Sequence, residues 1–230
     1  MKPLRTALWM VVALWLLVGC GSDGATVEPT PTPQEWLNRA VAQFQARQSF
    51  HFVLELEERA IPLDSSGLLA FNRVEGDVVV PDRVQAQARV STVMGSLEAG
   101  FVAVGDEQWL TNPLNGQWEA LPPEFRADLR LLFDPEIGIT SVVSDIENLT
   151  TVGDETVSDR SAIHLQGSLP GSALSDFAAD LPERVTVDLW VDRETNDILS
   201  VLLTEGGEEA ATWRFDFSDF DANPTIDAPA

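Results

Sequence analysis

The sequence predicts an α+β fold in which a large antiparallel sheet carries its helices on one face. Two patterns predict it. Most of the chain alternates apolar and polar residues with a period of two, the pattern of half-buried antiparallel strands. A stretch before these strands and another in their middle instead space apolar residues as a helix does. About 210 residues remain once the N-terminal segment is removed, so we expect one domain with its helices on the concave side of the sheet.

The N-terminus has the features of an export signal that ends in a lipid-attachment motif. Basic residues precede an unbroken apolar run over residues 7–18. The run ends in Leu17-Val18-Gly19-Cys20, which resembles the bacterial lipobox, where the acylated cysteine becomes the new N-terminus. The alternatives are a secretory signal with a cysteine near its cleavage site and an uncleaved anchor, although a span needs roughly 20 apolar residues. We expect residues 1–19 to be a signal peptide and an acylated Cys20 to hold the mature protein on the extracytoplasmic face of the cell membrane.

The mature chain is strongly acidic. Cleavage before Cys20 removes Lys2 and Arg5 and no acidic residue, which leaves 12 basic against 37 acidic residues and a net charge of −25. This charge argues against nucleic acid as a partner, because phosphate binding depends on clusters of Lys and Arg. It also indicates that acyl chains, rather than anionic headgroups, hold the protein at the membrane. Since Cys20 is the only cysteine, the core is held together without disulfides.

Residues 20–33 are expected to form a tether that leads into a helix. The alternating Pro and Thr residues of the tether cannot pack a core, and they stiffen it to a reach on the order of 40 Å. Thr32 and Glu35 are spaced as a capping box, and Pro33 takes the first helical position. The predicted helix ends near Gln48 and buries one face, which carries Trp36, Leu37, Ala40, Val41 and Phe44.

Strands fill the region from residue 50 to residue 118. Residues 50–57 have one wholly apolar face, and residues 83–92 alternate strictly between apolar and polar. The remaining strands predicted here cover residues 68–74, 77–80 and 97–103, a strand through Trp109 and Leu110, and a return strand at Trp118, with turns at Pro81-Asp82, Gly105-Asp106 and residues 112–116.

The middle of the chain changes to helical spacing and then returns to strands. Residues 122–133 and 139–149 predict two short amphipathic helices, and residues 172–181 predict a smaller one. The last strands are predicted at residues 161–167, 185–191, 198–204 and 213–217, and the chain from Asp221 is predicted to be irregular. We take residues 34–226 as the folded domain and residues 227–230 as a tail.

The mature chain lacks the residue combinations on which most enzymes depend. It has no lysine, no thiol besides the acylated one, and none of the nucleophile-elbow, phosphate-loop or zinc-helix motifs. Its two histidines, His51 and His164, alternate with apolar strand residues, as packed or surface histidines do. Asp216, Asp219 and Asp221 could bind Ca²⁺, but they lack the glycine and the terminal glutamate of a calcium loop. We therefore expect no enzyme, no metal site and no cofactor.

Four inward strand positions carry unusually small side chains, and these are Ala86, Ala88, Ala99 and Ala103. The other inward residues of the sheet are large. Small residues on a curved sheet either let a helix approach closely or leave room for an apolar ligand. The residues alone leave both interpretations open.

Several short motifs occur in a distinctive order along the mature chain. They are Phe50-His51-Phe52, Arg83-Val84-x-Ala86, Val104-Gly105-Asp106-x-x-Trp109-Leu110, Asp134-Pro135-x-x-Gly138-Ile139, His164-Leu165-x-Gly167, Val187-x-Leu189-Trp190-Val191-Asp192 and Phe217-Ser218-Asp219-Phe220. Together with the lipobox and the tether, this order resembles the LppX/LprG (LppX_LprAFG) family of bacterial lipoproteins. The likeness covers essentially all of the mature chain.

The resemblance implies a curved antiparallel half-barrel with helices on its concave face, similar to the lipoprotein carriers LolA and LolB. It implies a protein that holds the acyl chains of lipids or glycolipids in an apolar cavity and carries them within the cell envelope, with an envelope transporter as a partner. The residues expected to line the cavity are Phe52, Leu54, Val84, Ala86, Leu97, Ala99, Phe101, Leu132, Val142, Val143, Ile146, Val187 and Leu189.

Two other functions compete with the carrier. The first is an interaction module of the envelope, with the same fold, a collapsed core and no ligand cavity. The second is an enzyme, which the missing catalytic residue combinations disfavour. A cavity smaller than a few hundred Å³ would favour the interaction module, because ligand pockets occupy about 300 to 1,000 Å³.

Overall fold

The computed structural model describes residues 30–58, 60–62, 70–92, 95–112, 115–126, 139–174, 181–206 and 210–229. The predicted signal peptide, Cys20 and most of the predicted tether lie outside this part. Residues 31–230 form one compact unit, and the description below concerns that unit. None of its described helices is long and apolar enough to span a membrane.

Helix α1 (Pro33–Ala46) begins at the predicted capping box. The Thr32 hydroxyl accepts a hydrogen bond from the backbone N–H of Glu35 at 3.2 Å, and the Glu35 carboxylate accepts one from the backbone N–H of Thr32 at 2.7 Å. The helix ends two residues earlier than predicted, since Arg47 already has an extended backbone. Its buried residues are Trp36, Leu37, Ala40 and Phe44, four of the five predicted.

The strands account for most of the described chain. Their bounds are β1 (Ser49–Glu57), β2 (Ile61–Pro62), β3 (Ala70–Val79), β4 (Arg83–Thr92), β5 (Gly95–Val104), β6 (Glu107–Thr111), β7 (Trp118–Ala120), β8 (Glu147–Val157), β9 (Arg160–Pro170), β10 (Arg184–Asp192), β11 (Ile198–Glu205) and β12 (Thr212–Ser218). The short helical segments are η1 (Pro123–Phe125), α2 (Ile139–Ser144) and η3 (Gly171–Leu174).

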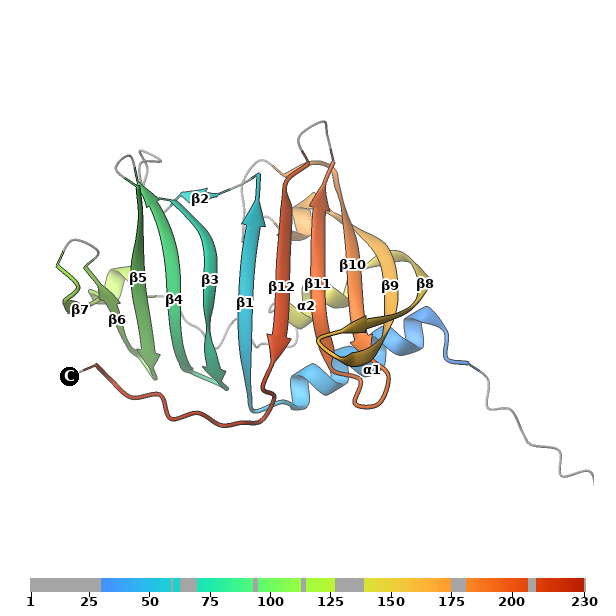
Figure 1. Ribbon diagram of the computed structural model, residues 1–230, viewed down its shortest axis with the longest axis horizontal. Coiled ribbons are helices and arrows are strands. Elements are labelled where there is room, and N and C mark those ends of the chain that lie inside the picture. The colour runs from blue at the N-terminus through green and yellow to red at the C-terminus, as the bar shows by residue number, and fades with distance from the viewer. Residues whose placement is uncertain are drawn as a thin grey trace, which may run out of the picture. The chain divides into compact units, whose positions relative to one another are not determined.

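All these strands join one antiparallel sheet in the order β7-β6-β5-β4-β3-β1-β12-β11-β10-β9-β8, with β2 paired to β3. The chain starts in the middle with β1 and builds outward to one edge through β7. It then crosses to the other edge at β8 and returns strand by strand until β12 pairs with β1 (Figure 1). The predicted α+β fold with a large antiparallel sheet is confirmed.

Two strands differ from the prediction. Residues 70–79 form one strand rather than two, and Gly76 lies inside it. A Cβ atom at Gly76 would lie 2.2 Å from the carbonyl oxygen of Gln85, so this glycine allows a close approach of β4 instead of breaking β3. Strand β8 was not predicted, and it includes residues 147–149, which the sequence assigned to a helix. Most β8 residues are exposed and the pairing is interrupted twice, so no clean alternation marks this edge strand.

The other predicted helices are only partly described. Helix α2 covers residues 139–144 of the predicted 139–149, η1 covers three residues of 122–133, and η3 lies at the start of 172–181. Residues 127–138 and 175–180 lie outside the described part.

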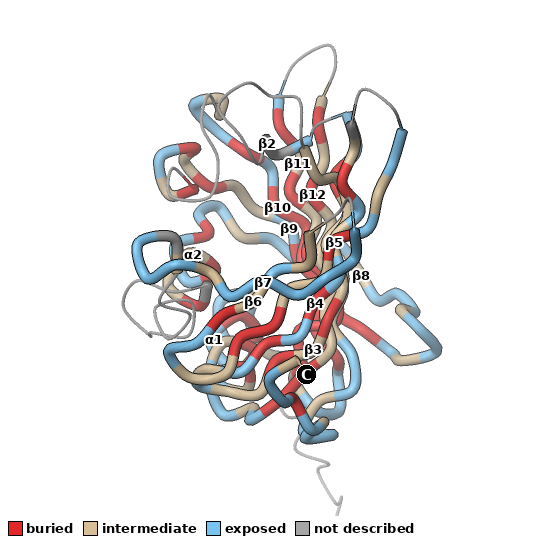
Figure 2. Tube along the Cα trace, turned by 90° about the vertical axis from the view of Figure 1, so that its left-hand side faces the viewer, coloured by how far each residue is buried: buried red, intermediate tan, exposed pale blue. Residues whose placement is uncertain are grey.

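One face of the sheet, here called the inner face, packs against α1. In Figure 1 the helices lie behind the sheet, so the viewer sees its outer face. The main hydrophobic core joins Trp36, Leu37 and Phe44 of the helix to Leu165, Leu189 and other inward strand residues. The buried positions appear in red along the strands in Figure 2.

Candidate functional site

The two halves of the inner face are packed differently. In the packed half (β9–β12), Leu165 and Leu189 are fully buried and Val187 is 1% exposed, and α1 packs over β8, β10 and β11. In the other half (β1 and β3–β6), the large inward side chains of Phe52 and Leu54 are only partly buried. We call this second region the small-residue half.

A set of small inward side chains, here called the small-residue patch, distinguishes the small-residue half. The pairing register places Gly76 beside Ala86, and Ala88 beside Ala99, in two neighbouring rows. The first row is bounded by Phe52 on β1 and Phe101 on β5, and the second begins at Leu54 and Val74. The small side chains therefore lie on β3 and β4 in the first row and on β4 and β5 in the second, beside larger apolar residues.

Seven of the predicted lining residues lie together on this inner face. Phe52 and Leu54 come from β1, Val84 and Ala86 from β4, and Leu97, Ala99 and Phe101 from β5. Their side chains are buried or partly buried, and the alanines at 86 and 99 are 7% and 6% exposed.

The remaining predicted lining residues lie elsewhere or are not described. Val187 and Leu189 belong to β10, three strands beyond β1, which is roughly 14 Å at the usual strand spacing. Val142 and Val143 lie on α2 and Ile146 just after it. They join the same hydrophobic core. Leu132 lies outside the described residues.

Sequence reasoning missed several residues of this face. Gly76 belongs to the small-residue patch, and Phe71, Val74 and Leu110 extend the apolar surface around it. The apolar side chains of Phe71 and Val74 were visible within predicted strands, but only the register shows that they share a face with Phe52.

Aromatic side chains cover the end of the inner face at which β1 begins, which is the lower end in Figure 1. Phe44 of α1, Phe50 of β1 and Phe217 of β12 form a triangle with ring centroids 5.0 to 5.8 Å apart. Edge-to-face contacts at these distances favour a fixed arrangement. The triangle therefore ends the apolar surface where the helix joins the sheet.

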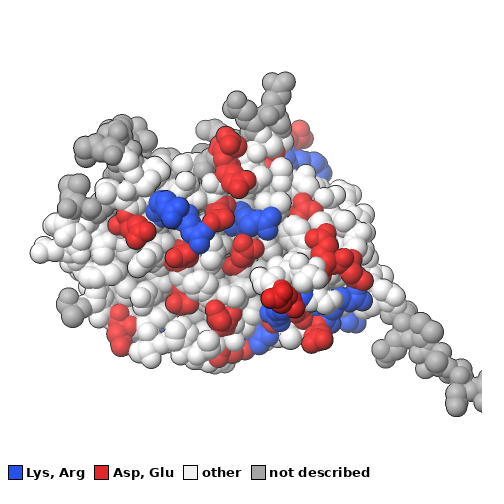
Figure 3. Space-filling view, viewed as in Figure 1, with Lys and Arg blue, Asp and Glu red and all other residues white. Residues whose placement is uncertain are grey.

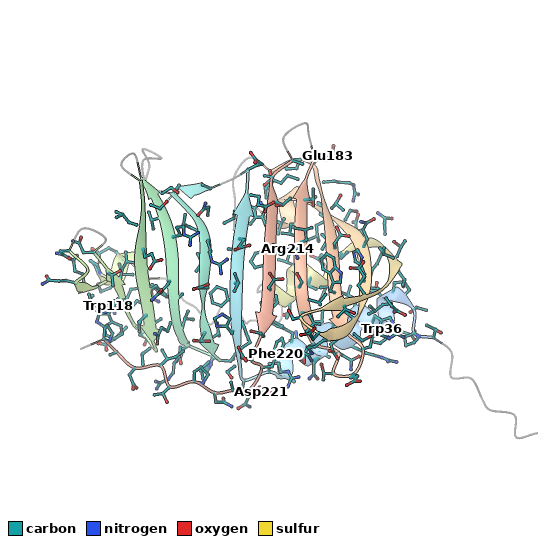
Figure 4. The ribbon with its side chains drawn as sticks, viewed as in Figure 1. Trp36, Trp118, Glu183, Arg214, Phe220 and Asp221 are labelled. Atoms are coloured by element: carbon teal, nitrogen blue, oxygen red, sulfur yellow. The ribbon has the colours of Figure 1, made fainter. Side chains whose placement is uncertain are left out.

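The C-terminal segment adds a strap along the same end. Asp221 accepts a hydrogen bond from the backbone N–H of Gln48 at 2.8 Å, and the backbone N–H of Asn223 donates to the Ser49 hydroxyl at 2.8 Å. Further along, Arg83 donates to the carbonyl of Ile226 at 2.8 Å, and Ile226 is 2% exposed. The segment is irregular, as predicted, but it is held against the lower ends of β1 and β4. Figure 4 labels Phe220 and Asp221 where it starts.

Charged side chains of both signs occupy the outer face (Figure 3). His164 lies there, with Nδ1 at 2.7 Å from the Glu155 carboxylate and Nε2 at 2.8 Å from that of Asp188. Its ring stacks on Trp190 with centroids 4.4 Å apart. Hydrogen bonds from Trp190 and His164 lower the pKa of Glu155. These contacts join β8, β9 and β10 and give His164 a structural role.

A second polar cluster holds the end of α1 to the packed half. Arg47 and Arg160 both reach Asp197, at 2.6 and 3.1 Å, and the Asp197 side chain is 3% exposed. Arg47 also pairs with Asp221, whose pKa is lowered by the backbone N–H of Gln48 and by Arg47. Asp221 is thus committed to the strap rather than to a calcium loop. Across the part of the chain that the structure describes, no three His, Cys, Asp or Glu residues are grouped to hold a metal ion.

What this arrangement offers chemically is an apolar surface. The inward rows of the small-residue half carry Phe, Leu, Val, Ala and Gly, and the ionisable groups described above lie on the outer face or at the lower end. Such a surface can bind acyl chains without forming covalent bonds.

Comparison with known proteins identifies the same family that the sequence motifs resemble. Residues 32–226 match the family model described as LppX_LprAFG lipoprotein. The chain is 25% identical to the lipoarabinomannan carrier protein LprG of Mycobacteroides abscessus, over 99% of this chain and 98% of that protein. It is 26% identical to the protein of the same name from Mycolicibacterium hassiacum, over 96% of this chain and 94% of that protein.

Two solved structures share the fold. The crystal structure of LprF from Mycobacterium bovis superposes with a TM-score of 0.68 at 18% identity, over 88% of this chain and 99% of that chain. The crystal structure of LppX from Mycobacterium tuberculosis superposes with a TM-score of 0.64 at 14% identity, over 85% of this chain and 98% of that chain. The more distant likeness to LolA and LolB stays a prediction.

Proposed function

The chain belongs to the LppX_LprAFG lipoprotein family, and on that premise we propose that it is a lipid-anchored carrier that binds the acyl chains of lipids or glycolipids. The small-residue patch between Phe52 and Phe101 is the observation that supports this function most directly. The relatives named as carriers of lipoarabinomannan support a glycolipid as one class of ligand.

The proposed mechanism is noncovalent. Acyl chains leave water for the inner face of the small-residue half, where Ala86, Ala88 and Ala99 contribute only small apolar side chains. Each buried CH₂ contributes roughly 0.8 kcal/mol relative to water. A chain that moves between a bilayer and this face exchanges one apolar environment for another, so loading and release can both proceed without an energy source in the carrier itself. The headgroup remains at the rim.

The proposed anchor is Cys20. Two or three acyl chains attached there hold a protein at a bilayer, whereas a single chain gives only marginal binding. Residues 20–33 then connect the anchor to α1, and the protein works on the extracytoplasmic face of the cell membrane with an envelope transporter as partner.

Native mass spectrometry tests this function on the mature protein made in a lipid-containing host. We expect about one diacyl or triacyl lipid to co-purify with each chain, and extraction would identify its headgroup. A protein without lipid that also takes up none from liposomes would contradict the carrier. That result would favour the interaction module, which the low exposure of Ala99 and Ala103 (6% and 0%) also suits.

A pair of matched variants tests the location of the ligand. Ala99→Trp places an indole in the small-residue patch of the inner face, whereas Gln85→Trp places the same group on the exposed outer face of β4. We expect Ala99→Trp to abolish lipid loading at a stability cost of about 1–3 kcal/mol, the usual range for overpacking. Gln85→Trp should load normally. Equal loading of both folded variants would place the ligand elsewhere.

A further inference from the structure

One edge of the sheet carries exposed apolar side chains. Among the described residues the large hydrophobic side chains that count as exposed are Leu110, Trp118 and Val152, at 40%, 37% and 53%. Leu110 and Trp118 lie in the neighbouring strands β6 and β7, whereas Val152 lies on β8 at the opposite edge. Figure 4 labels Trp118 at this edge, and in Figure 1 the edge lies at the far end of the sheet from α1.

Leu110 extends the apolar surface of the inner face to a position that is exposed to solvent. The register pairs Phe52 with Gly76, Gly76 with Ala86, Ala86 with Phe101 and Phe101 with Leu110. Along this row the side chains change from buried at Ala86 through partly buried at Phe101 to 40% exposed at Leu110. Apolar residues therefore continue the small-residue patch as far as Leu110 on β6, and the residue paired with Leu110 on the edge strand β7 is Glu119.

Trp118 lies on the outer face of the same edge, where its indole packs against the neighbouring strand β5. Its indole lies over Gly100, since a Cβ atom at Gly100 would be 2.7 Å from Trp118 Cη2. The backbone N–H of Gly100 donates to the hydroxyl of Thr111, the residue paired with Trp118, at 2.6 Å. One side of the indole is packed on backbone and the rest faces water. The edge thus has an apolar group on each face of the sheet.

The charges around this edge restrict what can contact it. Glu107, Glu119 and Glu124 are exposed there. Arg126 is the only basic residue between positions 95 and 126, and its guanidinium donates to the backbone carbonyls of Leu121 and Asp106. An anionic surface would be repelled, while a zwitterionic or uncharged one would accept the apolar groups.

From the continuous row and these charges we infer that the β6–β7 edge, through Leu110 and Trp118, contacts the interface of a bilayer with zwitterionic or uncharged headgroups during lipid exchange. Indole rings favour the headgroup level of bilayers, and an edge strand that stays at this depth keeps its unpaired backbone groups hydrated. This inference rests on the proposed carrier function, since it assigns the place where acyl chains enter and leave the row.

Vesicle binding of the mature chain with Cys20→Ser tests the contact, because this chain has no acyl anchor of its own. The probes are phosphatidylcholine vesicles and vesicles of equal parts phosphatidylcholine and phosphatidylglycerol. We expect flotation with the first and weaker flotation with the second. The double variant Leu110→Ser with Trp118→Ala should lower partition onto phosphatidylcholine about tenfold, as expected for removal of two apolar side chains from the contact. Val152→Ser is the matched control and should bind as the parent does.

Three results would overturn the inference. They are no binding of the parent chain to phosphatidylcholine, equal binding of the double variant, and a preference for the anionic vesicles. The first would assign the edge to a protein partner instead. Fluorescence quenching by brominated phosphatidylcholine gives a second measurement on the folded parent chain, and it should be lost in Trp118→Phe. Unchanged quenching in that variant would also contradict the contact.

A loading assay separates this inference from the carrier function. Uptake of a fluorescent long-chain fatty acid in solution, without vesicles, should be the same in the parent and in the single variant Trp118→Ala, because Trp118 lies on the outer face. Transfer of the fatty acid to phosphatidylcholine vesicles should be slower in this variant. Failure of the parent to load contradicts the carrier, whereas normal loading with unchanged transfer in the variant contradicts only the role of the edge.

Discussion

The packed half and the small-residue half belong to one continuous sheet, yet they bury their inner faces to different extents. In β10 and β11 most residues are buried, on both faces, whereas most residues of β3 and β5 are partly buried or exposed. Backbone pairing is continuous through both. The difference lies in side-chain size and in the helix above the packed half. A single sheet thus combines a region with fully buried inward side chains and a region whose larger inward side chains, Phe52, Leu54 and Phe101, are only partly buried.

The largest expected effect compares one leucine from each half. Leu165→Ala removes a fully buried side chain of β9, and we expect a loss of about 2–5 kcal/mol in the free energy of unfolding. Leu54→Ala removes the same atoms from a partly buried site of β1 and should cost clearly less. Urea unfolding measures both. Equal losses would mean that the two halves contribute alike to stability, contrary to the comparison.

A smaller effect is expected from the polar cluster at the end of α1. Asp197→Asn leaves Arg47 and Arg160 without their shared carboxylate, and we expect a loss of about 2–3 kcal/mol. The control is Asp154→Asn, which removes the exposed partner of Arg193 and should change stability by less than about 0.5 kcal/mol. Thermal unfolding checks both. A neutral Asp197→Asn would show that the apolar contacts of α1 hold it in place alone.

The smallest effect concerns acid. The pKa of Asp221 is lowered by the backbone N–H of Gln48 and by Arg47. Burial would raise the pKa of Asp192, but hydrogen bonds from the backbone N–H groups of Thr195 and Glu194 outweigh it and lower that pKa. A lowered folded-state pKa means that the carboxylate stabilises the fold above its unfolded value, about 3.9, and that this contribution is lost as the pH falls through the folded value.

We therefore expect the midpoint temperature of unfolding to decrease when the pH is lowered below about 4. Asp221→Asn should lower that midpoint at neutral pH and weaken its acid dependence. A variant that keeps the full acid dependence would show that other carboxylates control it.

Local patterns in the sequence predicted the elements that depend on local chemistry. The capping box fixed the start of α1, and strict alternation predicted β4 with the bounds observed. Strand β8 could not be predicted, because an exposed edge strand with interrupted pairing has no apolar periodicity. The prediction of separate strands at residues 68–74 and 77–80 was wrong for a related reason, since a glycine between them has no side chain that continues the apolar alternation.

The candidate site was predictable only in part. Alternation places Ala86, Ala99 and Phe101 on one face of their own strands, and this follows from each strand separately. That Leu54 and Val74 face the same side depends on the pairing of β1 with β3, and that Val187 lies three strands from β1 depends on the pairing of β1 with β12. This pairing joins the two ends of the domain's sequence and leaves no local signal.

The same pairing has a consequence for how the chain acquires its structure. A chain synthesised from its N-terminus makes β1 first, but one side of β1 has no partner until residues 212–218 follow at the end. Until then the part of the sheet formed by β1 and β3–β7 has an open edge along β1, the strand that carries Phe52 and Leu54. Pairing so distant in sequence closes slowly, because a long loop must be ordered first. The sheet is therefore completed only after synthesis of the domain is nearly finished, and the nascent chain is open to mispairing until that moment.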